Sequence, residues 1–467
     1  MSAPSVPGRG GQAGTPSVGR TAVRPGGSGA SGGVSRAPRD LGRDRTVLGP
    51  VAATAVVAMV WLLLELSVQP WSRSDSLGGT DSSSLLKGLV LLACLLGLVV
   101  FTPPRTHLVI PPVFRIYLLF TVTVILSSLL LPSSLTIMIR AGRFMAGIAV
   151  LALLFPLIKD RAYTFVRIMF GVHVVLGLSV VAGLLFLPSQ AWLDGRNFAQ
   201  GGRLMGAVMP MMPPRVGEIG AVVLGLGILL WALRLLPLPF ALAAVALGAA
   251  LIMLSRTRTA PLAALTGLLL AALALRRHPG TRRILGVFLA ACVAAAPFLG
   301  TISTWALRGQ DTSQLERLSG RTLVWDFILS QPMTDLTRWF GHGLGEKRIL
   351  LRRGEGDINY MAIDNSWLDS YWESGVVGLV LIVAAALAAL LYALRTPEPG
   401  ARAVAAFLCG YVLVASINES GLCDLSSMTL LLLASAQLSL CGRSHTKGLP
   451  AGDVSRGPRF SILSGRK

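Results

Sequence analysis

The chain has 467 residues, of which 53% are hydrophobic and only 14% are charged, and its mean hydropathy is +0.66. Repeated apolar runs of about 20 residues are typical of membrane-spanning helices, so the composition excludes an ordinary water-soluble enzyme and predicts a polytopic membrane protein. The net charge of +20 does not indicate nucleic-acid binding. Most of the basic excess lies in tails and short loops, where it orients a membrane protein and contacts anionic membrane lipid.

The chain begins with a tail over residues 1–46 that is rich in Gly, Pro, Ser and Arg, which predicts a disordered, basic, cytoplasmic segment. About twelve apolar runs follow, and each is a candidate span. They cover residues 47–68, 85–101, 112–131, 135–158, 162–187, 218–235, 237–254, 260–275, 283–300, 376–394, 403–417 and 427–440. The predicted domains are the tail, transmembrane helices 1–9 over 47–300, a long outer loop over 301–375, helices 10–12 over 376–441, and a basic cytoplasmic tail over 442–467.

Basic residues in the short loops predict the orientation of these spans. With the N-terminus inside, the inner loops carry Arg105, Arg234, Arg276 and Arg395, which follows the positive-inside rule. Three outer segments nevertheless hold arginines, namely Arg196, Arg203 and Arg215, then Arg256 and Arg258, then Arg308, Arg317 and Arg321. Because topology disfavours arginine on the outer face, we expect these residues to bind an anion there.

Residues 301–375 form the only long polar segment that lies between apolar runs. The segment holds seven large aromatic residues, Trp305, Trp325, Trp339, Tyr360, Trp367, Tyr371 and Trp372. Disordered segments are poor in aromatics, and long loops in compact proteins are usually functional. The sequence therefore predicts a small folded cap that carries the site.

No cofactor or metal site is expected from the sequence. The five cysteines show neither a disulfide framework nor metal-ligand spacing. The Gly-rich N-terminal stretch lacks the strand–helix context of a phosphate loop, and no zinc-protease motif is present.

Three patches carry a family resemblance. The first is Gly202-Arg203-Leu204-Met205-Gly206, and the second is Ser255-Arg256-Thr257-Arg258 at the end of an apolar run. The third is the most specific: it runs through Ser319-Gly320-Arg321, Trp325, Gly341-His342-Gly343, Asp364-Asn365 and Glu373-Ser374-Gly375. From about residue 202 to 391, the chain resembles the O-antigen ligase/polymerase superfamily of bacterial membrane glycosyltransferases.

The resemblance implies an all-α membrane protein of about twelve spans with an outer cap. It implies a glycosyltransferase of cell-envelope and exopolysaccharide synthesis in the bacterial plasma (inner) membrane, with both termini cytoplasmic. The donor would be a polyprenyl-diphosphate-linked oligosaccharide, such as an undecaprenyl diphosphate glycan, and the acceptor a glycan or glycolipid. The family works without a metal.

Residue roles follow from this chemistry. Arginine forks bind phosphate oxygens bidentately, so Arg203 and Arg321 are predicted to stabilise the departing diphosphate. Asp364 stands where the family usually has histidine, and it is the candidate base, with Glu373 as a further catalytic carboxylate. The expected substrate-binding residues are Arg256, Arg308, Arg317, Gly341, His342, Gly343 and Asn365.

Structural alternatives exist for several of these residues. In the alternative interpretation, Arg203 and Arg256 are interfacial arginines whose side chains snorkel to the lipid headgroups. Asp364 is then the N-cap of a following helix. The glycines around His342 are also explained by a tight turn. Glu218 and Glu419, at the outer ends of apolar runs, are open to both a role in the site and a structural role.

Two other functions remain open at this stage. A flippase for the same lipid-linked glycans would also use an arginine-lined cavity, although it is expected to show repeat symmetry. A relative that binds the carrier lipid without catalysis is the second alternative, since the family histidine is replaced. Ligase and polymerase differ only in their acceptor, which the sequence does not show.

Overall fold

The computed structural model describes residues 49–69, 82–101, 110–130, 135–193, 201–298, 300, 305, 321–332, 334–344, 348–353 and 357–441. These residues all belong to one compact unit. The predicted tails, and the expected substrate-binding Arg308 and Arg317, lie outside the described residues.

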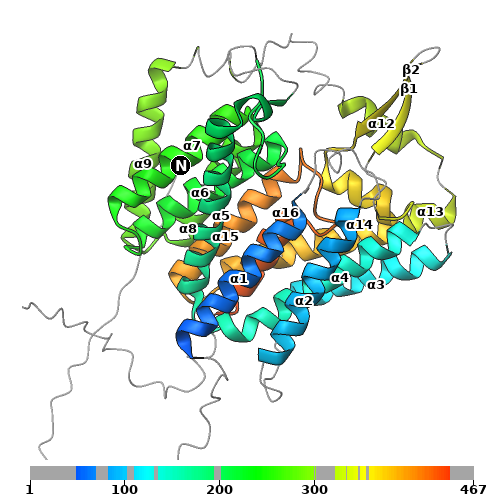
Figure 1. Ribbon diagram of the computed structural model, residues 1–467, viewed down its shortest axis with the longest axis horizontal. Coiled ribbons are helices and arrows are strands. Elements are labelled where there is room, and N and C mark those ends of the chain that lie inside the picture. The colour runs from blue at the N-terminus through cyan, green and yellow to red at the C-terminus, as the bar shows by residue number, and fades with distance from the viewer. Residues whose placement is uncertain are drawn as a thin grey trace, which may run out of the picture. The chain divides into compact units, whose positions relative to one another are not determined.

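Helices dominate the described chain (Figure 1). Before residue 300 they are α1 (Pro50–Val68), α2 (Ser82–Phe101), α3 (Pro112–Leu130), α4 (Leu135–Ile158), α5 (Ala162–Phe186), α6 (Pro213–Ala232), α7 (Leu238–Ser255), α8 (Thr259–Ala274) and α9 (Gly280–Ala295). After it come α12 (Arg321–Ser330), α13 (Asp335–Phe340), α14 (Ser366–Leu394), α15 (Pro399–Ala415) and α16 (Ser427–Leu438). Two short 3₁₀ turns cover Pro188–Gln190 and Ala296–Phe298. Every predicted apolar run falls on one of the long helices.

Six of these helices are long and apolar enough to cross a membrane. They contain the stretches Val51–Val68, Ile137–Ile158, Ala162–Phe186, Pro213–Ala232, Leu238–Ser255 and Ser366–Leu394. Five further apolar helices have only 10–17 residues in the same search. A multi-pass membrane protein is therefore confirmed in outline, while a total of twelve spans stays a prediction.

Two features of the segment after residue 321 differ from the sequence prediction. Strands β1 (Arg348–Arg353) and β2 (Asp357–Ala362) form an antiparallel hairpin, in which Arg348 pairs with Ala362 and Arg353 with Asp357. The prediction of an all-α chain is therefore incomplete. In addition, α14 begins at Ser366, before the apolar run that starts at residue 376, because Asn365 provides an N-cap.

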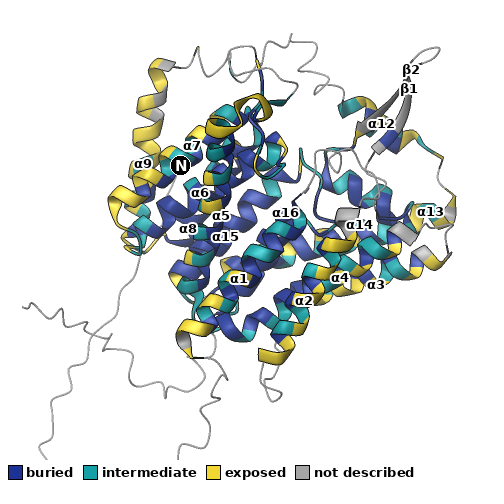
Figure 2. Ribbon diagram, in the orientation of Figure 1, coloured by how far each residue is buried: buried dark blue, intermediate teal, exposed yellow. Residues whose placement is uncertain are grey.

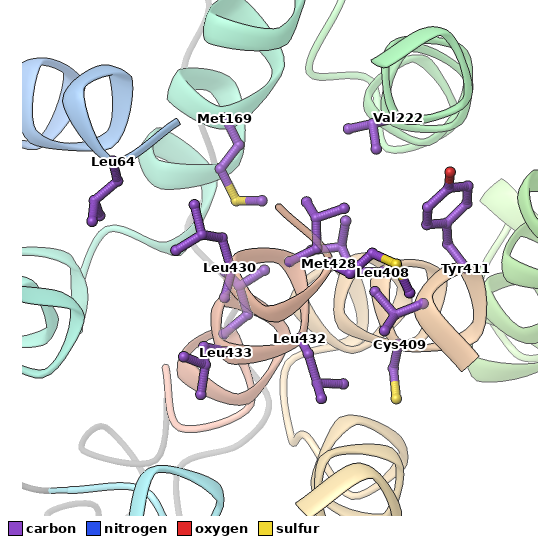
Figure 3. Packing of buried hydrophobic residues seen from close by; sticks show 14 of the residues in the cluster. Leu64, Met169, Val222, Leu408, Cys409, Tyr411, Met428, Leu430, Leu432 and Leu433 are labelled. Atoms are coloured by element: carbon purple, nitrogen blue, oxygen red, sulfur yellow. The ribbon is translucent and has the colours of Figure 1, made fainter. Parts of the chain in front are cut away.

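The core lies where α1, α5, α6, α15 and α16 meet. Every described residue of α16 is buried, as are most residues of α6 and α15, whereas α9 is largely exposed (Figure 2). Figure 3 shows the packing, with Leu64 from α1, Met169 from α5 and Leu430 from α16 in one apolar cluster. A helix buried all round must be apolar all round, which explains why α16 carries no charged side chain.

Helices α6 and α7 cross at unusually short range. A Cβ atom on Gly220 would lie 2.7 Å from the carbonyl oxygen of Gly248, and a Cβ on Gly248 would lie 2.5 Å from that of Gly220. Small residues allow helix backbones to approach closely where no hydrophobic force drives their association. This contact sets the position of Ser255 and the following arginines beside the start of α6.

A second, smaller core lies between α12, the hairpin and the first turns of α14. Val324 and Ile328 of α12 pack with Ile349 and Ile363, and all four are buried. Trp325, Tyr371 and Trp372 pack against this group. Three of the seven aromatic residues that marked this segment therefore have a structural role, since they cover the small core.

The predicted topology can be tested on α13, whose Trp339 is 52% exposed. We expect Trp339→Cys to react with a membrane-impermeant maleimide in intact cells, because residues 301–375 are predicted on the outer face. Arg277→Cys, at an exposed position in a predicted inner loop, is the matched control and should react only after permeabilisation. Labelling of Trp339→Cys only in lysed cells would reverse the predicted orientation.

Candidate functional site

An ion pair between Arg321 and Asp364 marks the candidate site. Nη2 of Arg321 lies 3.1 Å from Oδ2 of Asp364, and Nε donates to the same oxygen at 3.2 Å. Nη1 of Arg321 donates to Oδ1 of Asn418 at 3.4 Å. Both charged side chains are about one-third exposed, at 29% and 37%, so they are open to a ligand from solvent.

The backbone of Asp364 is held in an unusual conformation. Its φ angle is +46°, in the left-handed region that non-glycine residues rarely occupy and that costs about 1–3 kcal/mol. Asp364 lies between the end of β2 and the start of α14. The surrounding structure thus holds Asp364 in a strained backbone conformation, and such strain is common at functional sites.

Asn365, and not Asp364, caps α14. Its Oδ1 accepts hydrogen bonds from the backbone N–H of Trp367 at 2.9 Å and of Leu368 at 3.0 Å. Its Nδ2 donates to the carbonyl of Ile417 at 3.1 Å. The capping interpretation of Asp364 is therefore wrong, and Asn365, predicted to bind substrate, is buried in a structural role.

Arg203 approaches the same site from the segment between α5 and α6. Its Nε donates to the carbonyl of Ser255 at 3.2 Å, and the backbone N–H of Leu204 donates to the carbonyl of Leu254. Burial lowers the pKa of Arg203, Glu419 raises it, and Arg321 lowers it. Arg203 and Arg321 therefore lie close enough for their charges to interact, as the sequence predicted.

Arg258 is a third arginine of this group, while substrate binding by Arg256 stays a prediction. The charge of Arg258 acts on Arg203, and burial together with Arg321 lowers the pKa of Arg258. Arg256 ends α7 in a left-handed conformation, with φ of +51°, and its Nη1 lies 3.8 Å from where a Cβ on Gly201 would stand.

Glu419 is the functional candidate that the sequence missed. It lies in the loop between α15 and α16, and its pKa is raised to about 8, first by burial and then by the charge of Asp364. Arg321 and Arg203 lower this pKa, and Glu218 raises it. Its position after an apolar run, next to Asn418, was the signal that could have found it.

The G-x-G motif, residues 341–343, packs against a break in α14. At Gly375 the helix leaves helical geometry, with φ of +67° and ψ of −166°. The freed carbonyls of Trp372 and Glu373 accept hydrogen bonds from the backbone N–H groups of His342 and Gly343, each at 2.9 Å. The segment 341–343 thereby replaces the missing helical donors, which buried carbonyls require.

Close backbone contact explains why both crossing points are glycine. A Cβ on Gly341 would overlap the backbone of Glu373 and Ser374, and a Cβ on Gly375 would overlap that of Trp339 and Phe340. Both residues have positive φ angles. The tight-turn interpretation of these glycines is therefore supported. The ring of His342, also predicted to bind substrate, stacks on Trp372 at 3.9 Å between ring centroids.

Glu373 belongs to a different, fully buried group. Sγ of Cys423 lies 3.1 Å from Oε2 of Glu373 and 3.3 Å from Oδ2 of Asp369. These three ligand atoms lie within 4.8 Å of one another, and carboxylate and thiolate are ligands that zinc accepts. Among the described residues, this group is where a metal could be held, although the sequence predicted none.

A cavity of about 350 Å³ opens beside the arginines. Its lining includes Glu419, Tyr411 and Glu218. Glu218 forms an ion pair with Arg215 at 2.7 Å. Arg215 also pairs with Glu65 of α1 at 2.5 Å. The predicted outer arginine Arg215 is therefore committed to a buried network and is not part of the exposed group.

The comparison with known families agrees with the motifs. Residues 242–383 match the family model described as O-antigen ligase, and the resemblance to the O-antigen ligase/polymerase superfamily is thereby confirmed. The matched segment contains Arg258, Arg321 and Asp364. No curated protein matches the chain.

The helix break can be tested by adding one methyl group. We expect Gly375→Ala and Gly341→Ala to lower the melting temperature of the detergent-purified protein strongly, because a positive φ alone costs about 1–3 kcal/mol and the new Cβ would also meet backbone. Gly142→Ala is the matched control, since nothing lies within 4 Å of a Cβ there, and its melting temperature should not fall. Unchanged melting of Gly375→Ala would contradict the crossing.

Proposed function

Because the O-antigen ligase model matches residues 242–383, we propose that the protein transfers a glycan from a polyprenyl diphosphate to an acceptor hydroxyl at the outer face of a bacterial plasma membrane. The family match supports O-antigen ligase-type glycan polymerisation or ligation in general. To that general activity we add three specific features: a lipid-diphosphate donor, a glycan or glycolipid acceptor, and action at the outer membrane face.

The gathering of Arg203, Arg258 and Arg321 is the observation that carries this proposal. They come from three segments that are far apart in sequence, and like charges in one place repel one another. Burial, and after it the charges of neighbouring arginines, lowers the pKa values of Arg203 and Arg258. A bound anion removes this repulsion, and a diphosphate offers oxygens for several guanidinium forks at once.

The arginines would act on the leaving group. The acceptor oxygen attacks the anomeric carbon, and the bond from that carbon to the diphosphate oxygen breaks. The electron pair stays on the lipid diphosphate, whose growing charge is stabilised by the arginines. Oδ2 of Asp364 occupies the fork of Arg321 in this structure, so it holds the guanidinium in place until diphosphate oxygens compete for it.

The acceptor proton must pass to a base, and two carboxylates are candidates. Asp364 holds the position of the family histidine, but one of its oxygens accepts two hydrogen bonds from Arg321. Glu419 has a pKa of about 8, and a base works best when its pKa is near the working pH. We therefore assign proton transfer to Glu419, with Asp364 as the alternative acceptor.

Purified protein in lipid vesicles, supplied with a synthetic polyprenyl-diphosphate oligosaccharide, tests the proposed function. Longer glycans, or a glycan moved to an added acceptor, are expected. A flippase would move the carrier lipid across the vesicle with its glycan unchanged, and a binding relative would do neither. Either of these last results would reject the transferase.

Alanine at the two leading arginines should abolish most of the transfer. We expect Arg321→Ala and Arg203→Ala each to reduce the rate by about 10²-fold, because they remove charge stabilisation of the leaving group. Arg321→Lys should not restore it, since an ammonium lacks the planar fork. Arg338→Ala, at an exposed site on α13, is the control. Near-normal turnover in either alanine variant would remove that arginine from the diphosphate site.

The pH dependence of transfer should identify the base. Glu419 is protonated below its pKa of about 8 and ionised above it, so we expect the rate to rise between about pH 7 and pH 9. Glu419→Gln should lower the rate and flatten this rise, whereas Asp364→Asn should weaken donor binding and keep the rise. Loss of the rise in Asp364→Asn, with Glu419→Gln close to wild type, would assign the proton transfer to Asp364.

A further inference from the structure

The cavity beside the arginines has a lining unlike that of an anion site. Glu218, Glu419 and Asp424 contribute carboxyl groups to it. Among the described residues that line it, Arg215 alone carries a positive charge, and that charge is paired with Glu65 and Glu218. Because the one arginine in this lining is already paired with carboxylates, the described lining residues provide no further cation for a diphosphate. The arginine group and the cavity are therefore suited to different parts of a substrate.

Hydroxyl groups without protein partners face this space. Tyr411 is only 2% exposed and lines the cavity, and no described residue forms a hydrogen bond with its hydroxyl. Figure 3 shows the ring of Tyr411 directed away from Cys409 and Leu432, with the hydroxyl at its far end. Ser420 lines the same cavity, and its buried Oγ also has no hydrogen-bond partner among the described residues. Buried hydroxyl groups are normally hydrogen-bonded, so a ligand is expected to complete them.

The remaining walls are apolar. Met212, Pro214, Leu425 and Met428 line the cavity beside these polar groups. A sugar ring presents hydroxyl groups at its edge and C–H groups on its faces, which matches carboxylates and hydroxyls interleaved with aliphatic surface. The volume of about 350 Å³ falls within the range of about 300–1,000 Å³ for small-molecule sites and exceeds what one cation needs.

We propose that this cavity is a saccharide subsite that holds the acceptor end of a glycan, with Tyr411 and Ser420 as hydrogen-bonding groups. The assignment as the acceptor side rests on the proposed function. Glu419 lines the cavity and also interacts with the charges of Arg203 and Arg321. A hydroxyl bound here would therefore lie beside the base, while the donor diphosphate lies on the arginines.

A cysteine-protection experiment tests the subsite without requiring turnover. Thr259 lines the cavity, and Thr259→Cys would lie in a proteolytic peptide following Arg258 that contains no native cysteine. The rate at which methyl methanethiosulfonate modifies this cysteine is measured by mass spectrometry in the full-length protein. The probes are glucose, galactose, mannose, rhamnose and N-acetylglucosamine, each alone, then inorganic pyrophosphate, then Mg²⁺. Trp339→Cys on the exposed α13 is the matched control.

At least one sugar is expected to slow modification of Thr259→Cys and not of Trp339→Cys, while pyrophosphate and Mg²⁺ have no effect. Adding Tyr411→Phe to the Thr259→Cys protein should raise the sugar concentration that gives half-protection by about fivefold, because one hydrogen bond to the sugar is lost. Ser420→Ala is the second variant should Tyr411→Phe fail to fold. Protection by pyrophosphate or by Mg²⁺ alone, or by none of the probes, would overturn the saccharide assignment.

The result separates this inference from the proposed function. Protein that shows sugar protection but no glycan transfer would retain the saccharide site and lose the transferase. Active protein without sugar protection would keep the transferase and lose this subsite. In active protein, Tyr411→Phe should raise the KM for the acceptor and leave the KM for the lipid donor unchanged. Arg203→Ala should instead raise the KM for the lipid donor and leave the KM for the acceptor unchanged.

Discussion

The break of α14 at Gly375 is the constraint on which the site depends. It divides one helix into a membrane-length apolar half and a short half that begins at Asn365. The short half supplies Trp372 to the small core beneath the hairpin and accepts hydrogen bonds from the crossing segment at His342. Because Asp364 immediately precedes this half-helix, the carboxylate that meets Arg321 is placed by a backbone crossing some ten residues away along the chain.

The length of the apolar runs was sufficient to predict the helices that contain them, because an apolar run in this chain has few other ways to satisfy its backbone. The hairpin and the early start of α14 were not predicted. A six-residue strand such as β1, with three arginines, has no clear alternation of apolar and polar residues. A helix starting near this point was raised only as the alternative in which Asp364 is its N-cap, and the structure places the cap at Asn365. Only the crossing segment at Gly341 makes a helix with such a break stable.

The candidate site was predicted in part, and the division has a physical basis. Arg203, Arg321 and Asp364 carry recognisable motifs, and the structure brings them together. Arg258 was expected to bind an anion and Glu419 was left open, but their place in the site depends on long-range placement: one lies on the turn between α7 and α8, the other on a loop between α15 and α16. Glu373 carries the motif but lies with Cys423 in a buried group. A motif thus marks which residues matter and does not show which surface each one faces.

The pairing of Arg215 with Glu65 has a consequence for how the chain enters the membrane. Glu65 is fully buried in α1, and Arg215 lies near the start of α6, where it also pairs with Glu218, so Glu65 gains its arginine partner only when these two distant helices meet. An uncompensated charge within a bilayer is costly. During synthesis α1 emerges long before α6, and its acidic residue must be sheltered until the arginine arrives. We therefore expect α1 to remain close to the site of insertion until α6 is made, and we expect a shortened chain that begins after α5 to assemble poorly even though it retains the whole family-matched segment.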